Sequence, residues 1–171
     1  MVQEPEILYK LMVLYMLSEV SFPLTNSQLS DFFLEKEYTT YFTLQRVLND
    51  LCGTGFIEKR PVGTQTHYEL TDDGAATLRF FTNELSDEIK ADIDAYLKEN
   101  RFRMRSEVCL AADYYQSESS DYVVQLRILE GKGEILSVDV TLPDEDAAKS
   151  VAANWKANAQ KVYSYLMETL I

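Results

Sequence analysis

The chain has 171 residues, 46% of them apolar, and a formal net charge of −12, so it can bury one or two cores but attracts nucleic acid only weakly without specific contacts. No apolar run reaches the ~18 residues of a membrane span, two cysteines are too few for a disulfide scaffold, and the opening MVQEPEILYK lacks the pattern of a secretory signal. We therefore expect a soluble, cytoplasmic protein without a membrane partner.

Two helices are predicted in the first 35 residues. Apolar residues recur at three- and four-residue steps over residues 7–19, directly after Pro5, a residue typical of a first helical turn. In FPLTNSQLSDFF, Thr25 and Gln28 have the spacing of a capping box. The second helix therefore starts there and runs to about Glu35.

A third helix and a hairpin follow. The helix begins near Thr40, buries a leucine-rich stripe and ends at Gly53 and Gly55, which are typical of a helix C-terminus. Residues 56–60 and 66–70 are the predicted strands, and the segment PVGTQ between them contains the turn.

Two capped helices come after the hairpin. Thr71 is the first cap, and Asp72 and Asp73 lie in the first turn, where the helix dipole favours carboxylates. Ser86 caps a second helix, which connects to the rest of the chain and runs to residue 100.

The remainder of the chain changes to a two-residue period. Alternation from Phe102 to Tyr114 predicts one long strand, and the turns SESSD and EGKGE lead into two more, at residues 122–130 and 135–142. The segment PDEDAA opens a final helix with one apolar stripe, suited to covering the sheet. We therefore predict an α+β protein in three parts: residues 1–85, a connecting helix at 86–100, and a three-stranded antiparallel meander covered by one long helix at 101–171.

The order of three helices, a two-stranded wing and a helix is that of a winged helix-turn-helix domain. The segment LNDLCGTGFIEKRPVGTQTHYELTDDGAATL resembles the corresponding run in PadR-like bacterial regulators. The matching residues are Leu51, Gly55, Phe56, Ile57, Tyr68, Leu70, Thr71 and Gly74. The whole chain also resembles a bacterial family known only as a winged-helix domain of unknown function. The resemblance implies a winged-helix DNA-binding domain at residues 1–85 and a transcriptional regulator.

The third helix carries a polar face opposite its leucine stripe when residues are projected at 100° each. In a winged helix this face enters the major groove. Arg46 suits guanine, and Gln45 or Asn49 suits adenine. Thr43 or Phe42 suits the methyl group of thymine. The alternative is an ordinary solvated face, because the helix holds a single arginine.

The predicted wing carries Lys59, Arg60 and His67. Basic side chains at this place contact phosphate or the minor groove. The alternative is a plain polar hairpin. His67, the sole histidine, is either a pH sensor or part of the strand surface.

Two further sets of residues allow a site in the second half of the chain. The sequence has one concentrated basic patch, whose three arginines alternate onto one face of the predicted strand. These arginines either bind DNA or an acidic effector, or pair with nearby acidic side chains. The net charge of −12 favours the pairing. This patch consists of Lys98, Arg101, Arg103 and Arg105. Tyrosines either line a small-molecule pocket or fill the core. They are Tyr114, Tyr115, Tyr122, Tyr163 and Tyr165.

Catalysis and cofactor binding have little support. One histidine and two cysteines give no metal-ligand spacing and no nucleophile with its base, and no glycine-rich phosphate loop is present in the sequence. We therefore predict a non-enzymatic regulator that needs no cofactor.

The predicted partner is double-stranded DNA, bound by a homodimer at two half-sites, with a possible small-molecule or protein effector at the C-terminal domain. The candidate dimer surfaces are the apolar stripes of the first, fourth and connecting helices and a free edge of the meander. The alternative is a protein-interaction module that kept the winged-helix scaffold and lost DNA contact, with Phe42 as its exposed anchor.

Overall fold

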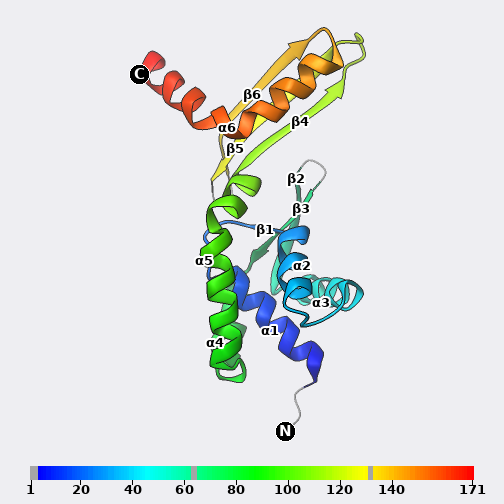
Figure 1. Ribbon diagram of the computed structural model, residues 1–171, viewed down its shortest axis with the longest axis vertical. Coiled ribbons are helices and arrows are strands. Elements are labelled where there is room, and N and C mark those ends of the chain that lie inside the picture. The colour runs from blue at the N-terminus through cyan, green and yellow to red at the C-terminus, as the bar shows by residue number, and fades with distance from the viewer. Residues whose placement is uncertain (1–3, 63–64, 131–132) are drawn as a thin grey trace. The chain divides into compact units, whose positions relative to one another are not determined.

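The computed structural model describes residues 4–62, 65–130 and 133–171. Within these residues the protein is α+β, with seven helices and two three-stranded antiparallel sheets (Figure 1). The chain forms two compact units, Met1–Met104 and Arg105–Ile171.

The first unit contains one sheet and most of the helices. In chain order its elements are α1 (Pro5–Ser18), β1 (Leu24–Thr25), α2 (Asn26–Glu35), α3 (Tyr41–Gly53), β2 (Ile57–Val62), β3 (Gln65–Leu70), α4 (Asp72–Phe81), the short 3₁₀ helix η1 (Thr82–Glu84) and most of α5 (Asp87–Cys109). The hairpin of β2 and β3 agrees with the predicted strands, and residues 63 and 64 of the predicted turn lie outside the described residues. β3 is the central strand, because β1 pairs with its other side.

The helix caps predicted at Thr25 and Ser86 are confirmed, and Thr40 caps the start of α3 as well. Thr25 and Gln28 form a reciprocal capping box at the start of α2. The Thr40 hydroxyl accepts a hydrogen bond from the amide of Thr43 at 3.3 Å. The Ser86 hydroxyl accepts one from the amide of Ile89, also at 3.3 Å, at the start of α5. Capping depends on residues three positions apart, so a local sequence pattern is enough to predict it.

Helix α1 lies at the centre of the first unit. It packs against α3, α4 and β3, and six of its residues are buried. The buried residues of α1 are Leu11, Met12, Val13, Leu14, Met16 and Leu17. Because four of these are consecutive, α1 is apolar on several sides, as expected of a helix enclosed by its neighbours.

The predicted strand that opens the meander is wrong in its first half, since α5 continues to Cys109. In RFRMR the arginines alternate with apolar residues, which fits a strand. Leu97, Met104 and Val108 are also spaced by seven and four residues, which fits one face of a helix, and each is at most 1% exposed. No proline or glycine interrupts α5, so each further residue extends the existing helix at little cost.

The second unit contains the other sheet and one long helix. After the end of α5 come β4 (Leu110–Gln116), β5 (Tyr122–Glu130), β6 (Gly133–Leu142) and α6 (Glu145–Leu170). The strands pair in the order β4-β5-β6, which confirms the predicted meander, although residues 131 and 132 of its second turn lie outside the described residues. The Asp144 carboxylate caps α6 by accepting a hydrogen bond from the amide of Ala147 at 2.8 Å.

The core of the second unit lies between α6 and the sheet. Trp155 is 3% exposed, and its indole Nε1 donates a hydrogen bond to the carbonyl of Arg127 at 3.0 Å. Ala148 and Ala159 are fully buried on the same face of α6, so their small side chains let the helix approach the sheet closely. Helix α6 packs mainly on β4 and β5, and its second half extends beyond the sheet (Figure 1).

A compact junction in the first unit joins the end of the hairpin to the loop after α3. The Thr71 hydroxyl donates to the carbonyls of Gly55 and Phe56, at 2.7 and 3.0 Å, and accepts from the amide of Gly74 at 3.1 Å. A Cβ atom added to Gly74 would lie only 2.0 Å from the carbonyl oxygen of Phe56. Only glycine therefore allows α4 to start so close to the beginning of β2.

We expect Gly74→Ala to lower the free energy of unfolding of the first unit by about 3 kcal/mol or more, because the backbone of Phe56 must move to admit the methyl group. Gly53→Ala is the matched control, since a Cβ atom there has nothing within 4 Å, and we expect it to change stability by less than about 1 kcal/mol. Urea unfolding followed by circular dichroism measures both. Similar midpoints for the two variants would contradict this account of the junction.

Candidate functional site

The outer face of α3 consists of Phe42, Arg46 and Asn49. Phe42 is 84% exposed, the Arg46 side chain is 62% exposed, and Asn49 is also exposed. The opposite face of the helix is buried and contains Leu44, Val47, Leu48 and Leu51. The apolar stripe thus fixes the rotation of α3 and leaves the three residues of the outer face in contact with solvent.

Gln45 and Thr43, which were predicted to read bases with this face, lie at its flanks. The carboxamides of Gln45 and Asn26 donate to each other, at 3.0 and 2.8 Å, and Asn26 also reaches the Tyr68 hydroxyl at 3.4 Å. Gln45 therefore joins α3 to Asn26 of α2, and reading a base would cost Gln45 two hydrogen bonds. Thr43 is half-buried and accepts a hydrogen bond from the Thr40 hydroxyl at 3.1 Å.

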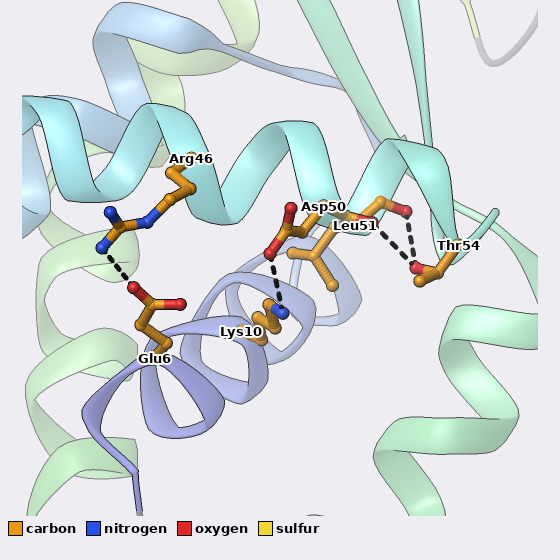
Figure 2. A network of polar contacts seen from close by, with 6 residues as sticks. All are labelled: Glu6, Lys10, Arg46, Asp50, Leu51 and Thr54. Carbon is orange, nitrogen blue, oxygen red and sulfur yellow. Dashed lines mark hydrogen bonds and ion pairs between the residues drawn. The ribbon is translucent and has the colours of Figure 1, made fainter.

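Two ion pairs connect α3 to α1, as Figure 2 shows. Arg46 pairs with Glu6, and Lys10 Nζ lies 3.0 Å from an Asp50 carboxylate oxygen. The side chains remain 33–62% exposed, so each pair contributes only about 0–1 kcal/mol to stability. Their main effect is on charge, because each carboxylate offsets the cation next to it.

The partners Glu6 and Lys10 are residues that sequence reasoning missed. A signal was present, since Glu6 and Lys10 are four residues apart on α1 and Arg46 and Asp50 are four residues apart on α3. The acidic residue of each helix faces the basic residue of the other: Glu6 pairs with Arg46, and Lys10 pairs with Asp50. Their pairing nevertheless depends on which faces of α1 and α3 meet, and this is a property of the tertiary structure.

The hairpin contributes two exposed basic residues, Lys59 and Arg60. Arg60 pairs across the hairpin with Glu69, at 3.1 Å between nitrogen and oxygen. The C-terminal end of α3 leads directly into this hairpin through Gly55, whose φ of 78° is a left-handed conformation that suits glycine. The hairpin thus follows α3 directly in the chain of the first unit.

The prediction that His67 lies on the surface of the wing is wrong. His67 is only 4% exposed, because β3 is a central strand and β1 pairs with it through Thr25. A two-residue strand is too short to show alternation, so no pattern along the chain indicates that His67 has strands on both sides. Burial lowers the pKa of the imidazole, and the positive charge of Arg60 lowers it further. His67 therefore does not reach a phosphate.

The burial of His67 has a consequence for stability at mildly acidic pH. Its pKa is lower in the folded chain than the ordinary value of about 6.5, so the unfolded chain binds the proton more tightly. The contribution of neutral His67 to the free energy of unfolding is fully present above about pH 6.5. This contribution is lost as the pH falls from there through the folded pKa of His67. We expect the free energy of unfolding to fall with decreasing pH in this window, by at most about 1.4 kcal/mol per pH unit. His67→Gln should flatten this slope in urea unfolding series, and an unchanged slope would contradict the assignment.

The predicted basic patch does not form one strand face, because its residues lie on helix α5. On a helix Arg103 points away from Arg101 and Arg105. Arg101 donates to the carbonyl of Glu19 at 3.0 Å, and Arg103 donates to the side-chain oxygen of Asn100 at 3.1 Å. At least two of the arginines thus make contacts within the first unit.

The five tyrosines of the second half do not line the groove that the second unit contains. Tyr114, Tyr115 and Tyr165 are exposed, and Tyr122 and Tyr163 are half-buried. The groove lies between α6 and the sheet and has a volume of about 370 Å³. Its lining residues are Leu126, Val138, Val140, Val151, Asn154, Trp155, Asn158 and Val162.

Within residues 4–62, 65–130 and 133–171, no three histidine, cysteine or acidic side chains are grouped so that they could hold a metal ion. In the same ranges, every helix is too short or too polar to span a membrane.

The family model described as "Domain of unknown function (DUF4364)" matches residues 9–170 of the chain. No curated protein matches the chain. The match extends over both compact units, so the first unit and the second unit are parts of the same family pattern.

Proposed function

The chain belongs to this DUF4364 family, and we propose that it is a winged-helix transcriptional regulator that binds double-stranded DNA as a homodimer. The element order of the first unit supports the proposal. Helices α2 and α3 correspond to a helix-turn-helix, α3 to its recognition helix, and β2 and β3 to a wing. A homodimer would present two recognition helices to two half-sites of DNA.

The observation that carries the proposal is the exposure of the outer face of α3, next in the chain to a hairpin with exposed Lys59 and Arg60. Arg46 has the chemistry to bond guanine, Asn49 to bond adenine, and Phe42 to contact the methyl group of thymine. Lys59 and Arg60 have the charge to contact the phosphate backbone next to the groove. Base reading and backbone contact thus come from neighbouring segments of the first unit.

The net charge of −12 opposes binding to DNA, and the weak ion pairs of Arg46 and Arg60 reduce this opposition at the proposed contact surface. Arg46 is paired with Glu6, and Arg60 is paired with Glu69. Exposed pairs of this kind contribute about 0–1 kcal/mol, whereas a bidentate contact between arginine and guanine contributes about 1–3 kcal/mol of discrimination. Leaving Glu6 for a guanine therefore costs Arg46 little. Specific binding survives in an acidic chain for this reason, while non-specific binding is weak.

Selection of bound fragments from genomic DNA tests the proposal. We expect the wild-type chain to enrich a defined set, and Arg46→Ala to bind the enriched fragment about tenfold more weakly or worse, because the base-reading guanidinium is lost. Arg79→Ala is the matched control: it removes an exposed arginine from α4, changes the net charge by the same amount, and should keep the enrichment. Equal enrichment by all three chains would reject the outer face of α3 as the reading surface.

The same assay has a second arm at the competing carboxylate. Glu6→Gln releases Arg46 and removes one negative charge, so this variant should bind the enriched fragment more tightly than the wild type. Glu99→Gln makes the same chemical change at an exposed position on α5 and should have a smaller effect. Equal gains in the two variants would mean that only the net charge matters.

A protein-interaction module on the same scaffold is the second candidate, and the exposure of Phe42 favours it. The rings of Phe42 and Tyr41 are 84% and 47% exposed and contact each other edge to face, with 6.0 Å between centroids. Exposed aromatic side chains are frequent anchors of protein interfaces. A wild-type chain that enriches no DNA, together with a protein partner that Phe42→Ala loses, would favour this candidate.

A further inference from the structure

The second unit has an apolar groove because α6 covers only part of its sheet. Helix α6 packs mainly on β4 and β5, and the face of β6 that points to the same side is less covered. Val138 and Val140 of β6 are half-buried and form one wall of the groove, and Trp155 and Val162 of α6 lie on the other. The lining contains no charged residue. Its composition therefore suits another apolar surface.

The same chain carries an apolar stripe that lacks a sheet to cover. Ala148, Trp155 and Ala159 occupy the part of α6 that covers the sheet. The stripe continues at helical spacing beyond Val162 through Leu166 and Leu170, near the C-terminal end of α6. The second half of α6 extends beyond the sheet (Figure 1). Leu170 is 74% exposed. The C-terminal half of α6 thus has an apolar stripe that could pack on the less covered β6 side of a sheet.

Charge favours a second copy of this chain as the occupant. Two copies of a chain with a net charge of −12 repel each other over most of their surfaces. Helix α6 is an exception, because it holds three lysines and three acidic residues and is therefore neutral. These residues are Glu145, Asp146, Lys149, Lys156, Lys161 and Glu168. A contact made by α6 on the uncharged groove avoids the repulsion.

We infer that two copies of the chain pair through their second units, with the stripe of Leu166 and Leu170 from each copy lying in the groove of the other. The arrangement is self-complementary, as a two-fold dimer requires, since each copy supplies one stripe and one groove. This pairing would form the dimer interface of the proposed regulator. Its role in DNA binding rests on the proposed function. The association itself needs no DNA.

Sedimentation velocity of the full chain without DNA tests the stripe. We expect the wild-type chain to dimerise and Leu170→Glu to raise the dissociation constant at least about tenfold, because a carboxylate enters an apolar contact in both copies. Ile171→Glu is the matched control: it places the same charge on the neighbouring residue, which is 99% exposed and points to another side. Both residues are exposed, so neither variant disturbs the fold of a single copy. A monomeric wild-type chain, or equal dissociation constants for the two variants, would overturn the inference.

A second pair of variants tests the groove separately. Asn158 lines the groove and is exposed, so Asn158→Glu puts a carboxylate there without changing the buried core, and it should weaken the dimer at least about tenfold. Asn83→Glu makes the same change in η1, outside the second unit, and should leave the dimer intact. A dimer that is indifferent to Asn158→Glu would overturn the inference, because its contact would lie elsewhere. These outcomes are independent of DNA binding, so they are distinguishable from a failure of the proposed function.

Discussion

The hydroxyl of Thr71 and the missing side chain of Gly74 make the contact on which the first unit depends. Thr71 bonds the carbonyls of Gly55 and Phe56 while it caps α4, and Gly74 allows the carbonyl of Phe56 to approach the helix. Three elements therefore meet at one point: the loop after α3, the start of β2 and the start of α4. Because the loop after α3 is fixed at this junction, the hairpin and the outer face of α3 keep a constant relation to each other.

The surface produced by this arrangement is exposed but not strongly basic. Phe42, Arg46 and Asn49 reach solvent, while Glu6 from α1 offsets the charge of Arg46. A surface of this kind has little attraction for the DNA backbone in general and gains affinity only where a base can replace Glu6 as the partner of Arg46. In the proposed regulator the carboxylate thus raises selectivity at a small cost in affinity. Pairing of two copies through α6 would add affinity by joining two such surfaces.

Prediction from the sequence succeeded where the cause is local and failed where it is tertiary. The caps at Thr25 and Thr71, the hairpin and the meander were predictable, because capping and alternation depend on residues a few positions apart. The burial of His67 was not, since it requires a two-residue strand from a distant segment. The alternation in RFRMR fits a strand, the spacing of Leu97, Met104 and Val108 fits a helix, and α5 continues through the segment. The pairing of Glu6 with Arg46 depends on how α1 packs against α3.

The measurement that tests the central claim most directly is the change in backbone amide NMR signals when a DNA fragment selected by the chain is added. If the outer face of α3 reads DNA, the largest changes fall on α3 around Phe42, Arg46 and Asn49, with smaller ones on the hairpin at Lys59 and Arg60. Large changes confined to other segments, with the signals of α3 unmoved, would contradict the claim that this helix contacts the bases.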